Sequence, residues 1–280
     1  MTPPAGRRTE VVAPDGCRLA VVEVGGPAAP PVVVAHGVGS SARFTAAAFA
    51  SPVLASGRRL VTYDQRGHGQ SSSVARPEAH TLDRHVADLT AVVAALGVAP
   101  SLLVGVSLGA HAVVRAAAST DLAADAVVAC LPAWSGRARV GEGPHAAIAD
   151  EIRTVGVAGL VARLRADTAM PGWLRTTLLI DYPRHDPASL AAALLALDGG
   201  EAPTLDEVAA LPVPLGVVGW PDDPGHPLAV ASAWARAADG ALVTLRLGDL
   251  DAGLDRLGAA ALAAADTARD AHPGTPARQR

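Results

Sequence analysis

Short apolar runs alternate with longer amphipathic segments along most of the chain. The runs are rich in valine, leucine and alanine, which is typical of buried strands. They lie at Leu19–Val24, Pro31–Ala35, Leu60–Tyr63, Ser101–Val104, Ala126–Leu131, Leu215–Val218 and Leu242–Leu247. Helical periodicity between them predicts helices at Thr45–Ala55, Leu82–Leu96, Leu108–Ala118, Leu228–Ala238 and Gly258–Ala268. The pattern predicts an α/β fold with a mostly parallel, doubly wound sheet, and the first two runs, which no helix separates, predict an antiparallel start.

The strand pattern stops between Trp134 and Leu211. Helical segments are expected there instead, at Pro144–Thr154, Val157–Ala166, Trp173–Ile180 and Pro187–Leu197. A stretch this long without strands is uncommon as a loop but natural as a lid over the carboxyl edge of a parallel sheet. We therefore expect a core in two parts, 1–134 and 212–271, an inserted helical cap at 135–211 and a flexible tail at 272–280.

Composition and charge narrow the class of protein. A chain of 280 residues, 50% of them hydrophobic, buries a large core, and its net charge of −4 without runs of like charge argues against nucleic acid or an anionic membrane as a partner. The N-terminus lacks the apolar region of a signal peptide, and no apolar run reaches the roughly 18 residues of a membrane span. These features predict a cytoplasmic protein, and they leave its oligomeric state open.

Cysteine and histidine spacing gives no sign of a bound metal or cofactor. Cys17 and Cys130 both lie in apolar, strand-like segments, so they are expected to be small core residues. Zinc-type spacing and a phosphate-binding glycine loop after a strand are both absent from the sequence. No metal and no cofactor are therefore expected.

Candidate chemistry is concentrated at Gly105-Val106-Ser107-Leu108-Gly109. Ser107 stands where the apolar period changes from two residues to about 3.6, between a strand and a helix. This is the pattern of a nucleophile elbow, in which the serine is forced out of the sheet. The two flanking glycines avoid a collision of side chains with the neighbouring strand and helix.

The chain resembles the α/β-hydrolase family in four segments that occur in the family's order. The first is the strand and His-Gly loop Val32–Ser41, the second is the Asp-x-Arg-Gly-x-Gly-x-Ser loop within Tyr63–Ser71, and the third is the elbow. The resemblance implies Ser107 as nucleophile. It also implies an oxyanion hole formed by the backbone N–H groups of Val38 and Leu108.

The fourth segment, Leu215–Pro227, resembles the strand and loop that carry the acid of the family's catalytic triad. The usual spacing from Gly219 favours Asp222, whereas the Asp-Pro pair favours Asp223. We take Asp223 as the acid. After the last predicted strand, where the family places its histidine, the chain has carboxylates and no histidine before the final helix.

The identity of the general base is therefore open. His226 lies on the loop that holds Asp223, and we take it as the first candidate. A cap histidine, His145 or His185, is a second possibility. Asp251 stands roughly where the histidine belongs, but an exposed carboxyl with a pKa of about 4 has little tendency to accept a serine proton. If none of these groups is the base, the chain has lost hydrolytic activity.

Three tryptophans stand near the expected mouth of the site, and we expect them to line a substrate pocket: Trp134, Trp173 and Trp220. The resulting hypothesis is a serine hydrolase of a small ester, lactone or similar carbonyl compound. The alternative is a degenerate hydrolase fold that binds a small ligand or a protein without turning it over.

Overall fold

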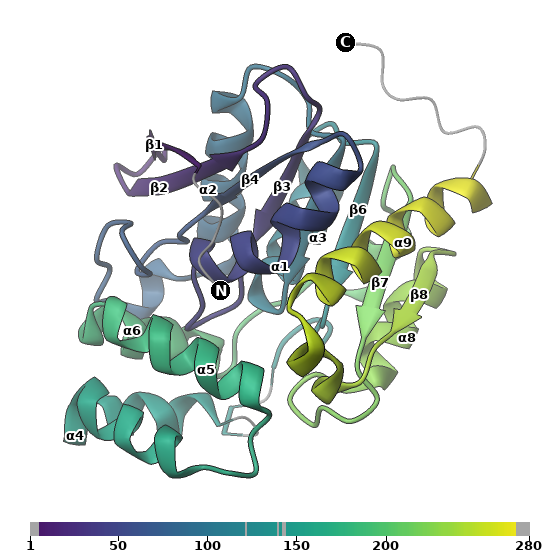
Figure 1. The fold of residues 1–280 in the computed structure, drawn as a ribbon. Helices are drawn as coiled ribbons and strands as arrows, with labels where there is room; N and C mark the ends of the chain where they lie inside the picture. Colours follow the sequence, from purple (N-terminus) through teal and green to yellow (C-terminus); the bar gives the residue numbers. More distant parts are fainter. Residues whose placement is uncertain (1–5, 121, 139, 142–143, 273–280) are drawn as a thin grey trace.

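The computed structural model describes residues 6–120, 122–138, 140–141 and 144–272. Eight strands of this part form one sheet in the order β1-β2-β4-β3-β5-β6-β7-β8 (Figure 1). Their bounds are β1 (Arg7–Val12), β2 (Arg18–Val24), β3 (Pro31–Ala35), β4 (Arg59–Tyr63), β5 (Leu102–Val106), β6 (Ala126–Cys130), β7 (Leu215–Gly219) and β8 (Ala241–Thr244). The five strands from β3 to β7 are buried at every residue, as their uninterrupted apolar sequences predict.

The sheet is parallel from β4 to β8 and antiparallel at its N-terminal edge, where β1 pairs with β2 and β2 pairs with β4. The predicted antiparallel start is therefore confirmed. β2 and β3 run in opposite directions but are separated in the sheet by β4. The edge strand β1 was not predicted, because five of its six residues are exposed and its sequence has no apolar face.

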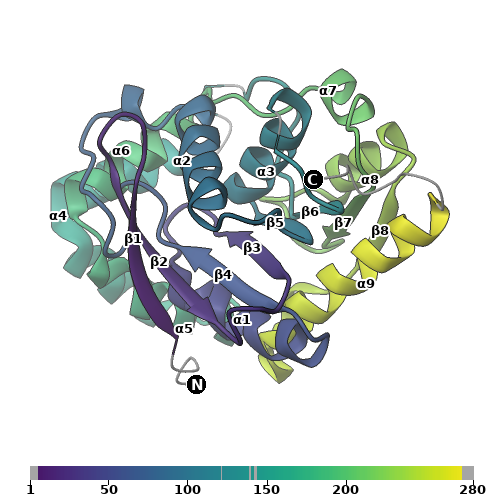
Figure 2. The same ribbon diagram turned by 90° about the horizontal axis from the view of Figure 1, so that it is seen from above.

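Helices cover both faces of the sheet (Figure 2). One face carries α2 (Leu82–Ala95), α3 (Leu108–Ser119) and α8 (Leu228–Ala237), and the other carries α1 (Ala42–Ala55) and α9 (Asp255–Ala271). Short 3₁₀ turns η1 (Pro77–Ala79) and η3 (Leu247–Ala252) lie in the connections before α2 and α9. Each face has its own apolar cluster, and the doubly wound architecture is as predicted. Both cysteines are buried and free.

Between β6 and β7 the described residues form the helical segments α4 (His145–Ala166), α5 (Gly172–Asp181), η2 (Tyr182–Arg184), α6 (Pro187–Leu197) and α7 (Leu205–Ala209), with one isolated antiparallel bridge between Arg137 and Glu201. Helix α4 packs on α5, η2 and α6 around a separate apolar cluster, at one end of the sheet (Figure 1). We call the segment 135–211 the cap. Gly156, with φ 69°, breaks α4 at the point where the pattern predicted two helices. α7 lies inside the range 135–211, but its Val208 packs in the core against α3 and α8.

The tail proposed at 272–280 lies outside the described residues except for His272, which caps α9.

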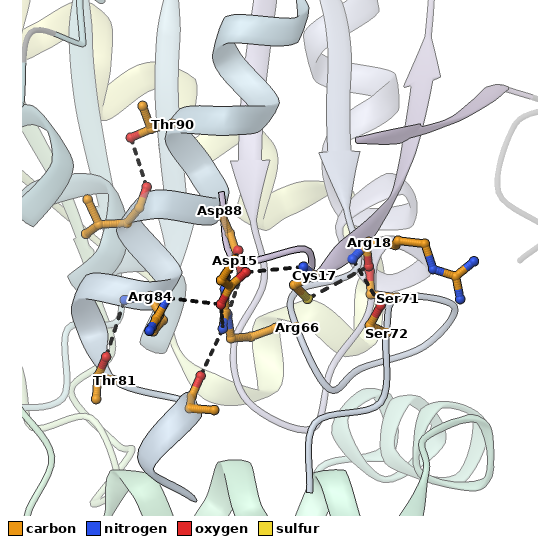
Figure 3. Close-up of polar contacts among 12 residues, drawn as sticks. Asp15, Cys17, Arg18, Arg66, Ser71, Ser72, Thr81, Arg84, Asp88 and Thr90 are labelled. Carbon is orange, nitrogen blue, oxygen red and sulfur yellow. Dashed lines mark hydrogen bonds and ion pairs between the residues drawn. The ribbon is translucent and has the colours of Figure 1, made fainter. Parts of the chain in front are cut away.

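A buried ion pair joins α2 to the loop after β4. The guanidinium of Arg66 meets both carboxylate oxygens of Asp88, at 2.7 and 2.6 Å, and it also contacts Asp15 at 3.0 Å (Figure 3). Asp88 is fully buried and Arg66 is 1% exposed. This pair therefore fastens the Asp-x-Arg-Gly loop to α2.

Replacing Asp88 with alanine should lower the free energy of unfolding by about 3–5 kcal/mol, because the guanidinium of Arg66 would stay buried without its main partner. Urea denaturation measures the change. The matched control is Asp83→Ala on the same helix, where the carboxylate is 82% exposed and 3.7 Å from Arg115. That variant should unfold like the wild type. Equal destabilisation by the two substitutions would contradict the role assigned to the Arg66 pair.

Candidate active site

Ser107 occupies a sharp turn between β5 and α3. Its φ of 54° and ψ of −115° lie outside the regions that non-glycine residues favour, which costs about 1–3 kcal/mol and is maintained by the packing around the turn. A Cβ on Gly105 would lie 2.0 Å from the carbonyl oxygen of Gly109, and one on Gly109 would lie 2.2 Å from that of Ala35. The elbow therefore requires glycine at both positions flanking the serine, and the sequence supplies it.

An imidazole meets the serine from the loop after β7. The Nε2 atom of His226 is 2.9 Å from Oγ of Ser107, and its Nδ1 is 2.7 Å from a carboxylate oxygen of Asp223. A carboxylate only accepts hydrogen bonds, so Nδ1 carries the ring proton of the neutral imidazole, and Nε2 is left to accept from the serine hydroxyl. Three side chains from two loops thus form one continuous hydrogen-bonded chain.

The carboxylate of Asp223 is held in its ionised form. Partial burial acts to raise its pKa, but the hydrogen bond and charge of His226 and the N–H of Gly225 act in the other direction and prevail, so the pKa lies below its usual value. The Gly225 N–H donates to the second carboxylate oxygen at 2.8 Å. Asp223 is therefore a negatively charged, oriented acceptor for the ring.

Three of the other candidate groups are engaged elsewhere. Asp222 accepts a hydrogen bond from the N–H of Leu247 at 2.9 Å, and Asp251 accepts one from the N–H of Trp173 at 2.7 Å. The two hydrogen bonds therefore fasten η3 to the loop after β7 and to α5. Of the two cap histidines, His145 lines the pocket described below, whereas His185 is bonded to the backbone of two core loops.

The expected oxyanion donors lie beside the serine. A Cβ on Gly37, the residue before Val38, would be 3.2 Å from Cβ of Ser107, and Leu108 is the first residue of α3. Among the hydrogen bonds between described residues, none is donated by the N–H of Val38 or of Leu108. Both groups are thus available to a ligand, and the one on Leu108 also has the positive end of the α3 dipole.

A pocket of about 490 Å³ opens next to Ser107 and His226. Its walls come from the elbow, the segment after β6, the cap and the Pro224–Pro227 loop, and they include Leu108, Trp134, Arg137, His145, Leu197 and Asp198. The charged residues Arg137 and Asp198 were not predicted, since they lie in loops of the cap without any motif. Such a volume suits a small organic molecule.

Only one of the three expected tryptophans belongs to this pocket. Trp134 lines it, and its ring also meets the ring of His111 edge to face at 4.7 Å between centroids. Trp173 and Trp220 instead contact each other at 5.6 Å on the face of the sheet that α1 and α9 cover, together with Phe44. The prediction that Trp173 and Trp220 line the substrate pocket is therefore wrong, because their nearness to the site in the sequence did not reveal that their side chains pack in the apolar cluster under α1 and α9.

The described residues contain no group of three or more His, Cys, Asp or Glu side chains that could hold a metal ion. In the same part of the chain, every helix is too short or too polar to cross a membrane.

Comparison with known proteins adds a family match. The model of the serine aminopeptidase S33 family matches residues 26–194, more than half of the chain. The matched region contains the elbow and the Gly37–Val38 loop, and it ends before Asp223 and His226. An epoxide hydrolase A of Mycobacterium tuberculosis is 38% identical over 111 residues, which is 38% of this chain and 33% of that relative. The match thus spans about a third of the relative's length.

Solved structures show the same fold over nearly the whole chain. An enol-lactonase from Burkholderia xenovorans LB400 is 22% identical, with a TM-score of 0.74 over 92% of this chain and 99% of its own. A bromoperoxidase from Bacillus anthracis is 17% identical, with the same TM-score of 0.74 over 92% and 99%. Because one fold carries such different activities, the choice among them depends on the site.

Proposed function

Because the chain belongs to the serine aminopeptidase S33 family of α/β-hydrolases, we propose that it is a serine hydrolase of small carbonyl compounds, such as an ester or a lactone. Ser107 is the nucleophile, His226 the general base and Asp223 the group that orients the base. The N–H groups of Val38 and Leu108 stabilise the oxyanion.

One observation carries this proposal: the hydrogen-bonded chain from Ser107 through His226 to Asp223, with separations of 2.9 and 2.7 Å. A serine hydroxyl is a weak nucleophile at its ordinary pKa and needs an adjacent base that is itself oriented by a third group. Ser107, His226 and Asp223 are suited to be the nucleophile, the base and the orienting group.

The first half of the reaction forms an acyl-enzyme. Oγ of Ser107 attacks the carbonyl carbon while Nε2 of His226 takes the hydroxyl proton, and the negative charge that develops on the carbonyl oxygen is stabilised by the two backbone N–H groups. Asp223 stabilises the imidazolium. The bond to the leaving oxygen then breaks, and His226 returns the proton to the departing alkoxide.

The second half releases the acid. A water molecule gives its proton to His226 as it attacks the acyl carbon, and a second oxyanion forms at the same N–H groups. The bond to Oγ then breaks, and the serine recovers its proton from His226. The net reaction consumes one water and yields an alcohol and a carboxylic acid, or one hydroxy acid from a lactone.

The alternative of a binding module without turnover rested on the lack of a histidine after the last strand. The imidazole of His226, 2.9 Å from Oγ of Ser107, supports a base on another loop and so argues against this alternative. A pocket of about 490 Å³ beside the serine supports a small substrate.

Labelling with a fluorophosphonate probe tests the proposal, because such a probe reacts with a serine activated by a base. Intact mass spectrometry should show one adduct per wild-type chain, and peptide mapping should place it on Ser107. The Ser107→Ala variant should stay unlabelled. Ser119→Ala is the matched control, since this exposed serine ends the same helix α3. An unlabelled wild type, or equal labelling of Ser107→Ala, would contradict an activated serine.

A further inference from the structure

A buried imidazole of the cap hydrogen-bonds to the oxyanion loop. His185 lies between η2 and α6 of the cap, and its side chain is buried, with 4% exposed. Its Nε2–H donates to the carbonyl oxygen of Gly39 at 3.1 Å, and its Nδ1 accepts from the N–H of Gly69 at 2.9 Å. One side chain of the cap thus joins the loop that follows β3 to the loop that follows β4.

Both backbone polar groups of Gly39 are hydrogen-bonded to histidine side chains. Its N–H donates to Nε2 of His68 at 3.0 Å, and the Nδ1–H of His68 donates to the carbonyl oxygen of Arg66 at 2.9 Å. The rings of His68 and His185 meet edge to face, with centroids 5.1 Å apart. Gly39 has φ +69°, and a Cβ there would lie 2.7 Å from the ring of Tyr182, so only glycine lets the loop pass this close to the cap.

The same loop carries the N–H that the proposed reaction needs. The carbonyl oxygen of Gly37 accepts from Nδ1–H of His36 at 2.6 Å and from the N–H of Ser40 at 3.2 Å. The N–H of Val38 belongs to the same planar peptide unit and points opposite to that carbonyl. Its direction is therefore fixed by the loop, and the side chain of Val38 packs against the apolar cluster of the cap.

Both His68 and His185 act as neutral rings. Burial lowers the pKa of His68 well below its ordinary value, and burial also lowers the pKa of His185. With one nitrogen accepting from a backbone N–H in each ring, the proton must sit on the other nitrogen. Each imidazole therefore has one donor and one acceptor, and both are used.

We infer that His185 is a positioning residue of the proposed hydrolase, through which the cap holds the Gly37–Gly39 loop so that the N–H of Val38 faces the oxyanion. The inference rests on the proposed function. Its consequence is that the cap contributes to the transition state as well as to the walls of the pocket. Loss of the two hydrogen bonds should mainly lower kcat, because the oxyanion forms only after the substrate has bound.

The test compares His185→Phe, which keeps an aromatic ring against His68 but removes both hydrogen bonds, with His185→Gln, which retains a donor and an acceptor. Turnover of p-nitrophenyl butyrate is measured per active serine, counted by fluorophosphonate titration. For His185→Phe, kcat should fall by about 10- to 100-fold, below the roughly 10²- to 10³-fold effect of losing a whole oxyanion donor. KM should stay within about threefold, and His185→Gln should recover most of kcat.

Arg184→Ala is the matched control, because this neighbour of His185 is exposed and its guanidinium donates to the carbonyl oxygen of Ile180 in the cap. It should match the wild type. The inference is overturned if His185→Phe keeps the wild-type kcat per titrated serine, or if it loses only titratable serine or only substrate affinity. A wild type without Ser107-dependent turnover overturns the proposed function together with this inference, whereas an active wild type and an unaffected His185→Phe overturn this inference alone.

Discussion

Replacing His226 with alanine should lower kcat for a small ester by about 10⁴- to 10⁶-fold, because the loss of one member of a serine triad removes most of what the whole triad supplies. Nε2 of His226 is the only ring nitrogen within hydrogen-bond distance of Oγ of Ser107 among the described residues. KM should change much less, since the imidazole acts on the serine. Steady-state kinetics on p-nitrophenyl butyrate measures both constants.

The neighbouring aspartates provide a matched pair for the same prediction. Asp223→Asn should lower kcat by about 10⁴-fold, because an amide stabilises neither the imidazolium nor the required ring tautomer. Asp222→Asn should retain activity, since its side chain accepts from the backbone of Leu247 and an amide oxygen accepts equally well. A larger loss from Asp222→Asn than from Asp223→Asn would reverse the assignment of the acid, and an active His226→Ala would remove the base.

Acidification should begin to destabilise the protein near pH 6.5, well above the pH at which its carboxylates titrate. Burial lowers the pKa of four fully buried histidines, to about 3 for His111 and in the same direction for His36, His68 and His85. In the unfolded chain a histidine has a pKa of about 6.5. Below that pH the unfolded chain binds protons that the folded protein does not, so the free energy of unfolding must decrease as the pH falls.

The expected slope is about 1.4 kcal/mol per pH unit for each such histidine, or roughly 5 kcal/mol per unit for the four. A domain with a typical stability of about 5–15 kcal/mol then unfolds one to three units below pH 6.5. The pKa of Asp223 is lowered in the folded protein, so this group stabilises the fold above the pKa of about 4 that it has in the unfolded chain. That stabilisation is lost only as the pH falls further, through the folded-state pKa. Urea denaturation between pH 7.5 and 5 measures the slope.

His85→Phe gives an internal check on the acid effect. Neither ring nitrogen of His85 has a hydrogen-bond partner among the described residues, so phenylalanine removes a titrating group without breaking a hydrogen bond. The slope should fall by about 1.4 kcal/mol per pH unit. A free energy of unfolding that is constant or rises between pH 6.5 and 5.5 would show that the buried rings are protonated in the folded state.

The sequence predicted the central strands and the elbow well because each has a strong local signal. Buried parallel strands are uninterrupted apolar runs, and the elbow needs glycine at two positions where a Cβ would meet a backbone oxygen at 2.0 and 2.2 Å. The edge strand β1 is held by backbone pairing with β2 rather than by buried side chains. Its sequence therefore carries no comparable signal.

The site was predictable only in part. Sequence placed His226 on the same loop as Asp223, but its distance to Ser107, 119 positions away, depends on how the turn at Gly225 directs the ring. The direction of a side chain at the end of a strand was equally hidden for Trp220, which turns to the core. Arg137 and Asp198 come to the pocket through the packing of the cap, which leaves no trace at the positions themselves.

His226 and Asp223 are three residues apart on one loop, so the conformation of one short turn sets their separation, whereas groups on two separate loops would have to be aligned by the whole sheet. The acid and the base therefore travel together as one cassette. Transplanting residues 222–227 to the same edge of a related scaffold would bring both groups to its serine in a single exchange. The same compactness makes this short segment a natural starting point for engineering a hydrolase from an inactive member of the fold.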